Sequence, residues 1–246
     1  MYINTTGIVL RATAYKDSSK ILTVLTGSEG KLTVTARGAL RRNCKFMAET
    51  QLLVFSEMTL FYGRDRWTLT EARSIAQFIG LRNDVQLLAL GSYFAELIEA
   101  ASDEDSPSPE LLPLFLNALF ALSEGIKAPE YVKPAFELRL MAAAGFSPLL
   151  SVCSVCGEQV PQRSYLNLEG GTVNCAECAQ GGSGISRGTL DAMRYITSCN
   201  PKKLFSFKLA EPALRELYRA SEGYLLAQFD REFRTLDYYK VIIGSC

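Results

Sequence analysis

Histidine is absent from all 246 residues of the chain. This absence removes the usual general base, the partner of a serine or cysteine nucleophile, and the commonest ligand of catalytic zinc. The phosphate-binding pattern Gly-x-x-x-x-Gly-Lys-Ser/Thr is also missing, which excludes an ATP site of that type. We therefore expect a protein that is not an enzyme.

Long apolar runs are lacking as well. No stretch of about 18 or more apolar residues occurs, and the chain does not open with a basic segment followed by an apolar one. We expect no membrane contact, no export, and hence a cytoplasmic location.

The chain has no net charge, with 26 basic and 26 acidic residues, but this charge is unevenly distributed. The first 80 residues hold 11 lysines and arginines against 6 acidic residues, whereas the remainder holds 15 against 20. An excess of one sign in one part of a chain suggests a partner of the opposite sign. A polyanion facing the N-terminal part is one explanation, and an ordinary solvated surface is the other.

Short runs rich in β-branched residues, separated by turn residues, predict an all-β N-terminal segment. The expected strands lie near Thr6–Tyr15, Lys20–Thr26, Lys31–Arg37, Leu52–Tyr62 and Trp67–Ile75. Five strands in about 75 residues are typical of an oligonucleotide-binding (OB) barrel. An SH3-like barrel gives a similar pattern, so the sequence pattern leaves this choice open.

After Gly80 the apolar period becomes helical, behind Asp84 as the expected helix cap. The later helices are expected to begin at Ser108 and Pro109, and to span Tyr131–Ala144, Ser186–Ser198 and Glu211–Phe229. The predicted fold class is α+β. We expect an OB domain at residues 1–80 and a helical domain at residues 81–246, interrupted by a zinc ribbon at residues 150–184.

The sharpest chemical pattern is formed by two Cys-x-x-Cys pairs. Cys153 and Cys156 are followed, after 18 intervening residues, by Cys175 and Cys178. Four thiolates satisfy tetrahedral Zn²⁺ and leave no open position for water, so a structural zinc site is predicted. Disulfides and a redox pair fit less well, and an iron–sulfur cluster remains a minor alternative. The other cysteines, Cys44, Cys199 and Cys246, are expected to be ordinary thiols.

A basic segment follows the third expected strand. It contains Arg37, Arg41, Arg42 and Lys45 within nine residues, which favours contact with phosphates. Cations at the expected hairpin turns could extend this track: Lys16, Lys20, Arg64 and Arg66. Tyr15, Phe46 and Tyr62 could stack on bases, but aromatic residues in strands more often belong to a core.

Two other functions can be weighed from the residues. A generic zinc-ribbon module acting in transcription or on RNA would need a basic ribbon, but residues 151–184 contain Arg163 as their one cation against three glutamates. A carboxylate-dependent hydrolase would have to use Asp103, Glu104 and Asp105, which lie in a Ser/Pro-rich loop typical of solvated surface.

Several segments, in their order along the chain, carry a family resemblance. They are Thr6–Arg11, Ser18–Thr26, Gly30–Gly38, Leu60–Gly63, Thr68–Ala72 and Phe136–Pro148. With the four cysteines that follow, this arrangement resembles the RecO family. The resemblance implies an OB barrel followed by a helical domain.

The resemblance also implies a function in DNA repair and homologous recombination. A bacterial, nucleoid-associated protein of this family would bind single- and double-stranded DNA, anneal complementary strands, and promote RecA loading onto DNA coated by single-strand binding protein (SSB). RecR and the acidic tail of SSB are the implied partners. For that tail we expect a site on the helix near Tyr131, formed by Lys133, Phe136, Arg139 and Leu140.

Overall fold

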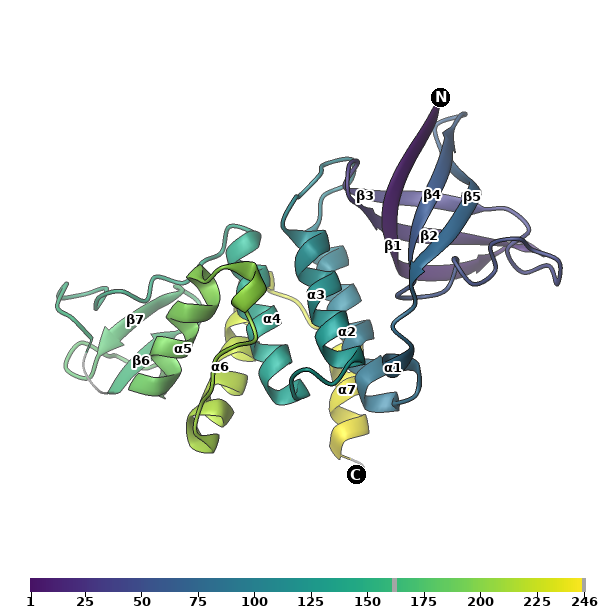
Figure 1. Cartoon of the computed structure of the whole chain (residues 1–246). Coiled ribbons are helices and arrows are strands. Elements are labelled where there is room, and N and C mark those ends of the chain that lie inside the picture. The colour runs from purple at the N-terminus through teal and green to yellow at the C-terminus, as the bar shows by residue number, and fades with distance from the viewer. Residues whose placement is uncertain (161–162, 245–246) are drawn as a thin grey trace. The chain divides into compact units, whose positions relative to one another are not determined.

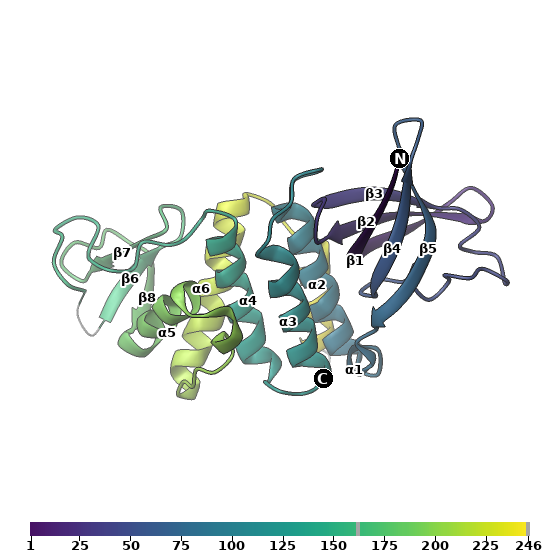
Figure 2. The same ribbon diagram turned by 45° about the horizontal axis from the view of Figure 1, so that its top comes forward.

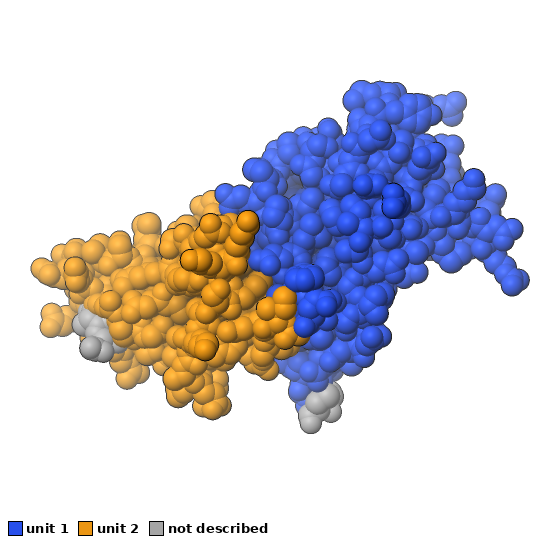
Figure 3. All heavy atoms as spheres, viewed as in Figure 1, with its two compact units in different colours: residues 1–124, 233–246 blue, residues 125–232 orange. Residues whose placement is uncertain are grey.

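A computed structural model describes residues 1–160 and 163–244 of the chain. It contains two compact units, which Figure 3 colours separately: Met1–Glu124 with Phe233–Cys246, and Gly125–Glu232. This division falls after Glu124 and tests neither the predicted boundary at residue 80 nor the predicted insertion at residues 150–184. Both stay predictions. Among the described residues, no helix is long and apolar enough to cross a membrane.

Unit 1 begins with a closed five-stranded barrel, as predicted (Figure 1). Its strands are β1 (Tyr2–Tyr15), β2 (Ser19–Thr26), β3 (Lys31–Ala36), β4 (Phe55–Tyr62) and β5 (Trp67–Ala76). Around the barrel they follow the order β1-β2-β3-β5-β4, and β4 pairs with β1. All neighbours are antiparallel except β3 and β5. This Greek-key closure is that of the OB type.

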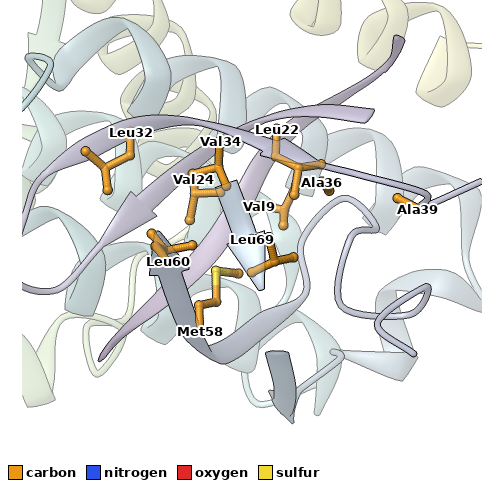
Figure 4. Packing of buried hydrophobic residues seen from close by; sticks show 10 residues of the cluster. All are labelled: Val9, Leu22, Val24, Leu32, Val34, Ala36, Ala39, Met58, Leu60 and Leu69. Atoms are coloured by element: carbon orange, nitrogen blue, oxygen red, sulfur yellow. The ribbon is translucent and has the colours of Figure 1, made fainter. Parts of the chain in front are cut away.

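The barrel interior is filled by aliphatic side chains that alternate along the strands. In β3, Leu32, Val34 and Ala36 are buried. Thr33 and Arg37 point to solvent, as the two-residue period of a strand requires. Figure 4 shows the interdigitating cluster, which consists of Val9, Leu22, Val24, Leu32, Val34, Ala36, Ala39, Met58, Leu60 and Leu69.

The connection between β3 and β4, residues 37–54, contains no strand or helix and extends beyond one end of the barrel (Figures 1 and 2). We call it the basic arm. Ala39 is buried in the barrel core, and Phe46 packs against that core. Lys20 Nζ donates to both the carbonyl oxygen and Oγ1 of Thr50, at 3.2 and 3.3 Å. The arm is therefore held at several points along its length.

Helices complete unit 1: α1 (Ile79–Arg82), α2 (Val85–Ala101), α3 (Leu111–Ser123) and α7 (Arg234–Gly244). Asp84 caps α2 by accepting from the backbone N–H groups of Gln86 and Leu87, as predicted. The expected start of α3 at Ser108 and Pro109 is wrong, because the helix begins at Leu111 without a side-chain cap. The sequence analysis also missed α7, which packs along α2 and whose Thr235 donates to Glu96.

Unit 2 consists of helices with a small sheet beside them (Figure 2). The helices are α4 (Pro129–Ala143), α5 (Arg187–Ser198), the 3₁₀ turn η1 (Pro201–Lys203) and α6 (Glu211–Phe229). The sheet has the order β7-β6-β8, with β6 at Arg163–Asn167, β7 at Thr172–Cys175 and β8 at Ser183–Ser186. The predicted bounds of α6 are confirmed, and α5 follows Ser186, which serves as its cap.

Charged side chains hold α4 against α6 in the interior of unit 2. Lys133 is completely buried, and its Nζ lies 2.7 Å from Glu137 Oε1 and 2.8 Å from Glu222 Oε2. Its Nζ also lies 4.1 Å from the ring centroid of Tyr218, and Ser221 donates to Glu137 at 2.7 Å. Burial alone would lower the pKa of Lys133, but the two glutamates outweigh it and raise that pKa above its usual value.

This arrangement corrects the predicted docking site for an acidic tail. Lys133, Phe136 and Leu140 have no exposed surface, because α4 is covered on most of its circumference. Arg139 is half-buried, and its Nη1 donates to the carbonyl oxygen of Thr197 at 2.9 Å. These residues pack the interior of unit 2 and cannot offer a pocket to a peptide.

Replacing Lys133 with Met should lower the free energy of unfolding by about 3–5 kcal/mol, since it leaves Glu137 and Glu222 buried without their cation. Urea denaturation monitored by circular dichroism would measure the loss, with exposed Lys202→Met as the control. The deficit should shrink at low pH, where the stranded carboxyls can protonate. In the wild type, the contribution of Lys133 is present below its ordinary pKa of 10.5 and lost only above that value. A deficit below about 1 kcal/mol would contradict this role.

Candidate metal centre and nucleic-acid interface

The four cysteines of the two Cys-x-x-Cys pairs come together in unit 2. Their Sγ atoms all lie within 4.8 Å of one another, and those of Cys156 and Cys175 are 3.9 Å apart. All four are free thiols. They are therefore positioned to bind one metal ion through four sulfur ligands.

Backbone hydrogen bonds shape both cysteine turns. In the first turn, the N–H of Cys153 donates to Glu158 and the N–H of Gly157 donates back to Cys153, at 2.9 and 3.0 Å. Gly157 has a φ of 75°, a left-handed conformation that favours glycine. In the second turn, the N–H groups of Cys178 and Ala179 both point to the carbonyl oxygen of Cys175. Each turn thus brings its two thiols to the same side.

The electrostatics of the cluster favour a bound cation. Backbone N–H groups of Cys156, Cys175 and Val155 lower the pKa of Cys153 to about 6. Hydrogen bonds that the protonated Cys178 thiol makes to its neighbours, to Cys175 first, raise the pKa of Cys178 to about 12. The Cys153 thiolate therefore forms easily, whereas ionisation of Cys178 is opposed by its neighbours. A divalent metal removes this opposition, and four thiolate ligands leave no open position for a reacting water.

The cysteine turns are connected to the rest of unit 2 by backbone contacts. Ser154 N–H donates to Val173 in β7 at 3.0 Å. Arg194 of α5 donates to the carbonyl oxygens of Leu150 and Ser151, which precede the first cysteine. Loss of a metal bound here would therefore loosen β7 and the contact between α5 and the segment that precedes the first cysteine.

The basic arm exposes its four predicted cations. Arg37, Arg41, Arg42 and Lys45 all point to solvent, and together with Phe46 they line a hollow of about 510 Å³. Within residues 1–160 and 163–244, none of these four cations forms an ion pair. An exposed cluster of cations without carboxylate partners is suited to an anionic ligand.

The β1–β2 turn lies beside the arm. The N–H of Leu40 donates to the carbonyl oxygen of Ser18 at 2.9 Å. Lys16 is exposed in this turn, with its Nζ 5.2 Å from the centroid of the Tyr15 ring. Lys20 is half-buried and bound to Thr50, so the structure gives it the role of anchoring the arm. Of the two predicted turn lysines, Lys16 is thus the one free to meet a ligand.

Arg64 and Arg66, in the β4–β5 turn, are also exposed, but their surroundings differ. Arg66 lines a groove of about 500 Å³ along the outer side of β3, next to Trp67 and Tyr62, whose ring centroids are 4.9 Å apart. Three carboxylates line the same groove: Asp65, Glu104 and Asp105. The groove thus combines aromatic faces with mixed charge. Trp67 packs partly against the barrel core and also lines this groove, a second role that its position on a strand did not indicate.

Replacing Cys175 with Ser should abolish metal binding, because it removes one of four convergent ligands, and should lower the thermal stability of unit 2. Metal content per chain and the melting temperature are the measurements. Cys199→Ser is the matched control, since Cys199 is a free thiol outside the cluster and should leave the metal content unchanged. A full complement of metal in the Cys175 variant would refute the ligand assignment. Cys246 lies outside the described residues.

Comparison with known proteins covers nearly the whole chain. The family models described as recombination protein O N terminal and C terminal match residues 1–78 and 82–237. A DNA repair protein RecO from Acetivibrio thermocellus is 32% identical over 244 residues, with 98% of this chain and 97% of the relative covered. One from Symbiobacterium thermophilum is 31% identical over 242 residues, with 96% and 95% covered. The barrel, the helices and the sulfur cluster described above are thus those of a chain that belongs to the RecO family.

Proposed function

We propose that the chain acts in DNA repair and homologous recombination by binding single- and double-stranded DNA on its barrel. The observation that carries this proposal is the basic arm, with four exposed cations free of ion pairs in the described part of the chain, placed on an OB barrel. Release of counterions from DNA phosphates would supply the binding free energy. The family relationship supports the same function.

The phosphate contacts are assigned to Arg37, Arg41, Arg42 and Lys45, with Lys16 beside them. Arg66 is assigned a secondary role, because Asp65, Glu104 and Asp105 line the same groove and repel phosphates. Arg64, which is exposed in the same turn, is assigned a secondary role with it. The Tyr62 and Trp67 rings could stack on an exposed base, worth about 1–3 kcal/mol. Lys20 contributes by holding the arm in place.

In this proposal the protein anneals complementary strands and, with RecR, promotes RecA loading onto SSB-coated DNA. These activities follow from the family relationship and need no catalytic residue. Among the described residues, three or more potential metal ligands gather only at the four cysteines, so Asp103, Glu104 and Asp105 offer little support for a hydrolase.

The metal ion held by the four cysteines is proposed to be structural Zn²⁺. Four thiolates in two short turns match its preference, and they exclude an open catalytic position. The ribbon is a poor reader of nucleic acid, since residues 151–184 contain Arg163 as their one cation and three acidic residues, Glu158, Glu169 and Glu177. This composition argues against a generic zinc-ribbon module acting in transcription or on RNA.

Neutralising Arg41 and Arg42 together to Ala should weaken DNA binding to a similar degree across sequences. The slope of log affinity against log salt should flatten by about one to two units, because two phosphate contacts are lost. Titrations of a labelled oligonucleotide at several salt concentrations measure this slope. Arg219→Ala with Arg234→Ala, which removes two exposed arginines elsewhere, is the control. An unchanged slope would mean that the arm only solvates the surface.

The mediator activity is tested by mixing the protein with complementary strands coated by SSB. We expect annealing well above the rate without protein, and a marked loss in the Arg41→Ala, Arg42→Ala variant. A fluorescence-quenching pair on the two strands reports duplex formation. If the wild type leaves the coated strands unannealed while still binding DNA, the mediator role is wrong and only the binding function remains.

A further inference from the structure

The segment that joins α5 to α6 carries a second concentration of positive charge, which the sequence analysis missed. Residues 199–210 include three cations and no acidic residue. Lys202 and Lys203 are exposed on η1, and Lys208 is exposed farther along. None of these three lysines forms an ion pair within the portion of the chain that the structure describes. In a chain with no net charge, such a segment is a strong local field.

Aromatic rings lie between these lysines. The Phe207 ring is 5.5 Å from that of Tyr131 and 6.3 Å from that of Tyr195, measured between centroids. The Tyr131 hydroxyl donates to Leu209 at 3.1 Å, and the Tyr195 hydroxyl donates to Lys203 at 2.6 Å. All three rings are half-buried, so part of their surface remains accessible while their hydroxyl or ring contacts hold them in place.

Lys127 connects this segment to the start of α4. Its Nζ donates to the carbonyl oxygen of Phe207 at 2.9 Å and lies 4.3 Å from the centroid of the Tyr131 ring. Burial, and then the charge of Lys208, lower the pKa of Lys127. The cation therefore faces another cation instead of a carboxylate. An anion placed beside both lysines would relieve their repulsion.

We propose that this lysine–aromatic patch, formed by Lys127, Tyr131, Tyr195, Lys203, Phe207 and Lys208, is a second site for single-stranded DNA. Cations that alternate with ring faces suit a strand, whose phosphates and bases alternate in the same way. A point-like anion or an acidic peptide would use the charges but not the series of rings. The inference rests on the proposed function: annealing requires two strands to be held at once, and the barrel accounts for one of them.

The first test compares Lys203→Glu with Lys208→Glu against Arg219→Glu with Arg234→Glu, which makes the same change of charge at exposed residues outside both sites. We expect the patch variant to anneal naked complementary strands about tenfold more slowly than the control. Its affinity for one limiting strand should fall less than about threefold, because the arm still binds that strand. If the patch variant melts below the control, Lys203→Ser with Lys208→Ser replaces it, since serine adds no like charge.

The second test uses photo-crosslinking of the full chain to oligonucleotides that contain 5-bromodeoxyuridine. Crosslinked peptides should include Tyr131, Tyr195 or Phe207 in addition to the barrel, and these should disappear in the patch variant. A patch that only stabilises unit 2 would give no such crosslinks.

The outcomes separate this inference from the proposed function. A patch variant that anneals like its control, without crosslinks in the patch, overturns the second site while leaving DNA binding by the barrel intact. If the patch binds an aspartate-rich peptide and forms no DNA crosslinks, the second DNA site is wrong and the patch is a site for a protein partner. A wild type that neither binds nor anneals DNA refutes the proposed function and this inference together.

Discussion

The barrel closes through the parallel pairing of β3 with β5. This pairing determines where the basic arm and the β4–β5 turn, which carry the candidate DNA contacts, lie on the barrel. Val34 pairs with Trp67 and Thr35 with Thr68. Because β5 runs in the same direction as β3, the β4–β5 turn lies beside the first half of β3. The chain that leaves β3 as the basic arm lies toward the other end, next to the β1–β2 turn. The arginines of the arm are thus separated from those of the β4–β5 turn, and only the former escape the carboxylates of the groove.

Unit 2 is constrained differently, because its sheet is too small to form a hydrophobic core of its own. The strands have five, four and four residues, and they bury only a few side chains such as Leu166, Val173 and Ile185. A small element of this kind needs another source of stability, and the four cysteines are positioned to supply it by binding a metal ion. The helices supply the support: Glu216 of α6 accepts from Ser186 and Thr189 at the start of α5. Farther along the same helix, the glutamate contacts of Lys133 hold α6 to α4.

Local patterns predicted much of this structure, and the failures arise where distant segments decide. The strands, the Asp84 cap, the bounds of α6 and the convergence of the cysteines all depend on nearby residues, so the sequence sufficed for them. Lys133 and Glu137 form an i,i+4 pair that looks like solvated helix surface. Only the packing of α6, more than 80 residues later, buries it. Likewise, α7 is stabilised by contact with α2 from the other end of the chain, and its own short sequence gives a weak pattern.

The uneven distribution of charge has a physical consequence for the proposed function, in which DNA is transferred and not retained. Exposed lysines and arginines bind phosphates through contacts that salt and competing polycations readily displace. A high overall positive charge would strengthen every encounter with DNA and slow release, whereas a chain of zero net charge confines attraction to its basic surfaces. Acidic residues elsewhere, such as those of the ribbon, repel phosphates and so keep DNA off those surfaces. Zero net charge and strong local fields are therefore compatible, and their combination suits the proposed annealing of two strands followed by release of the duplex.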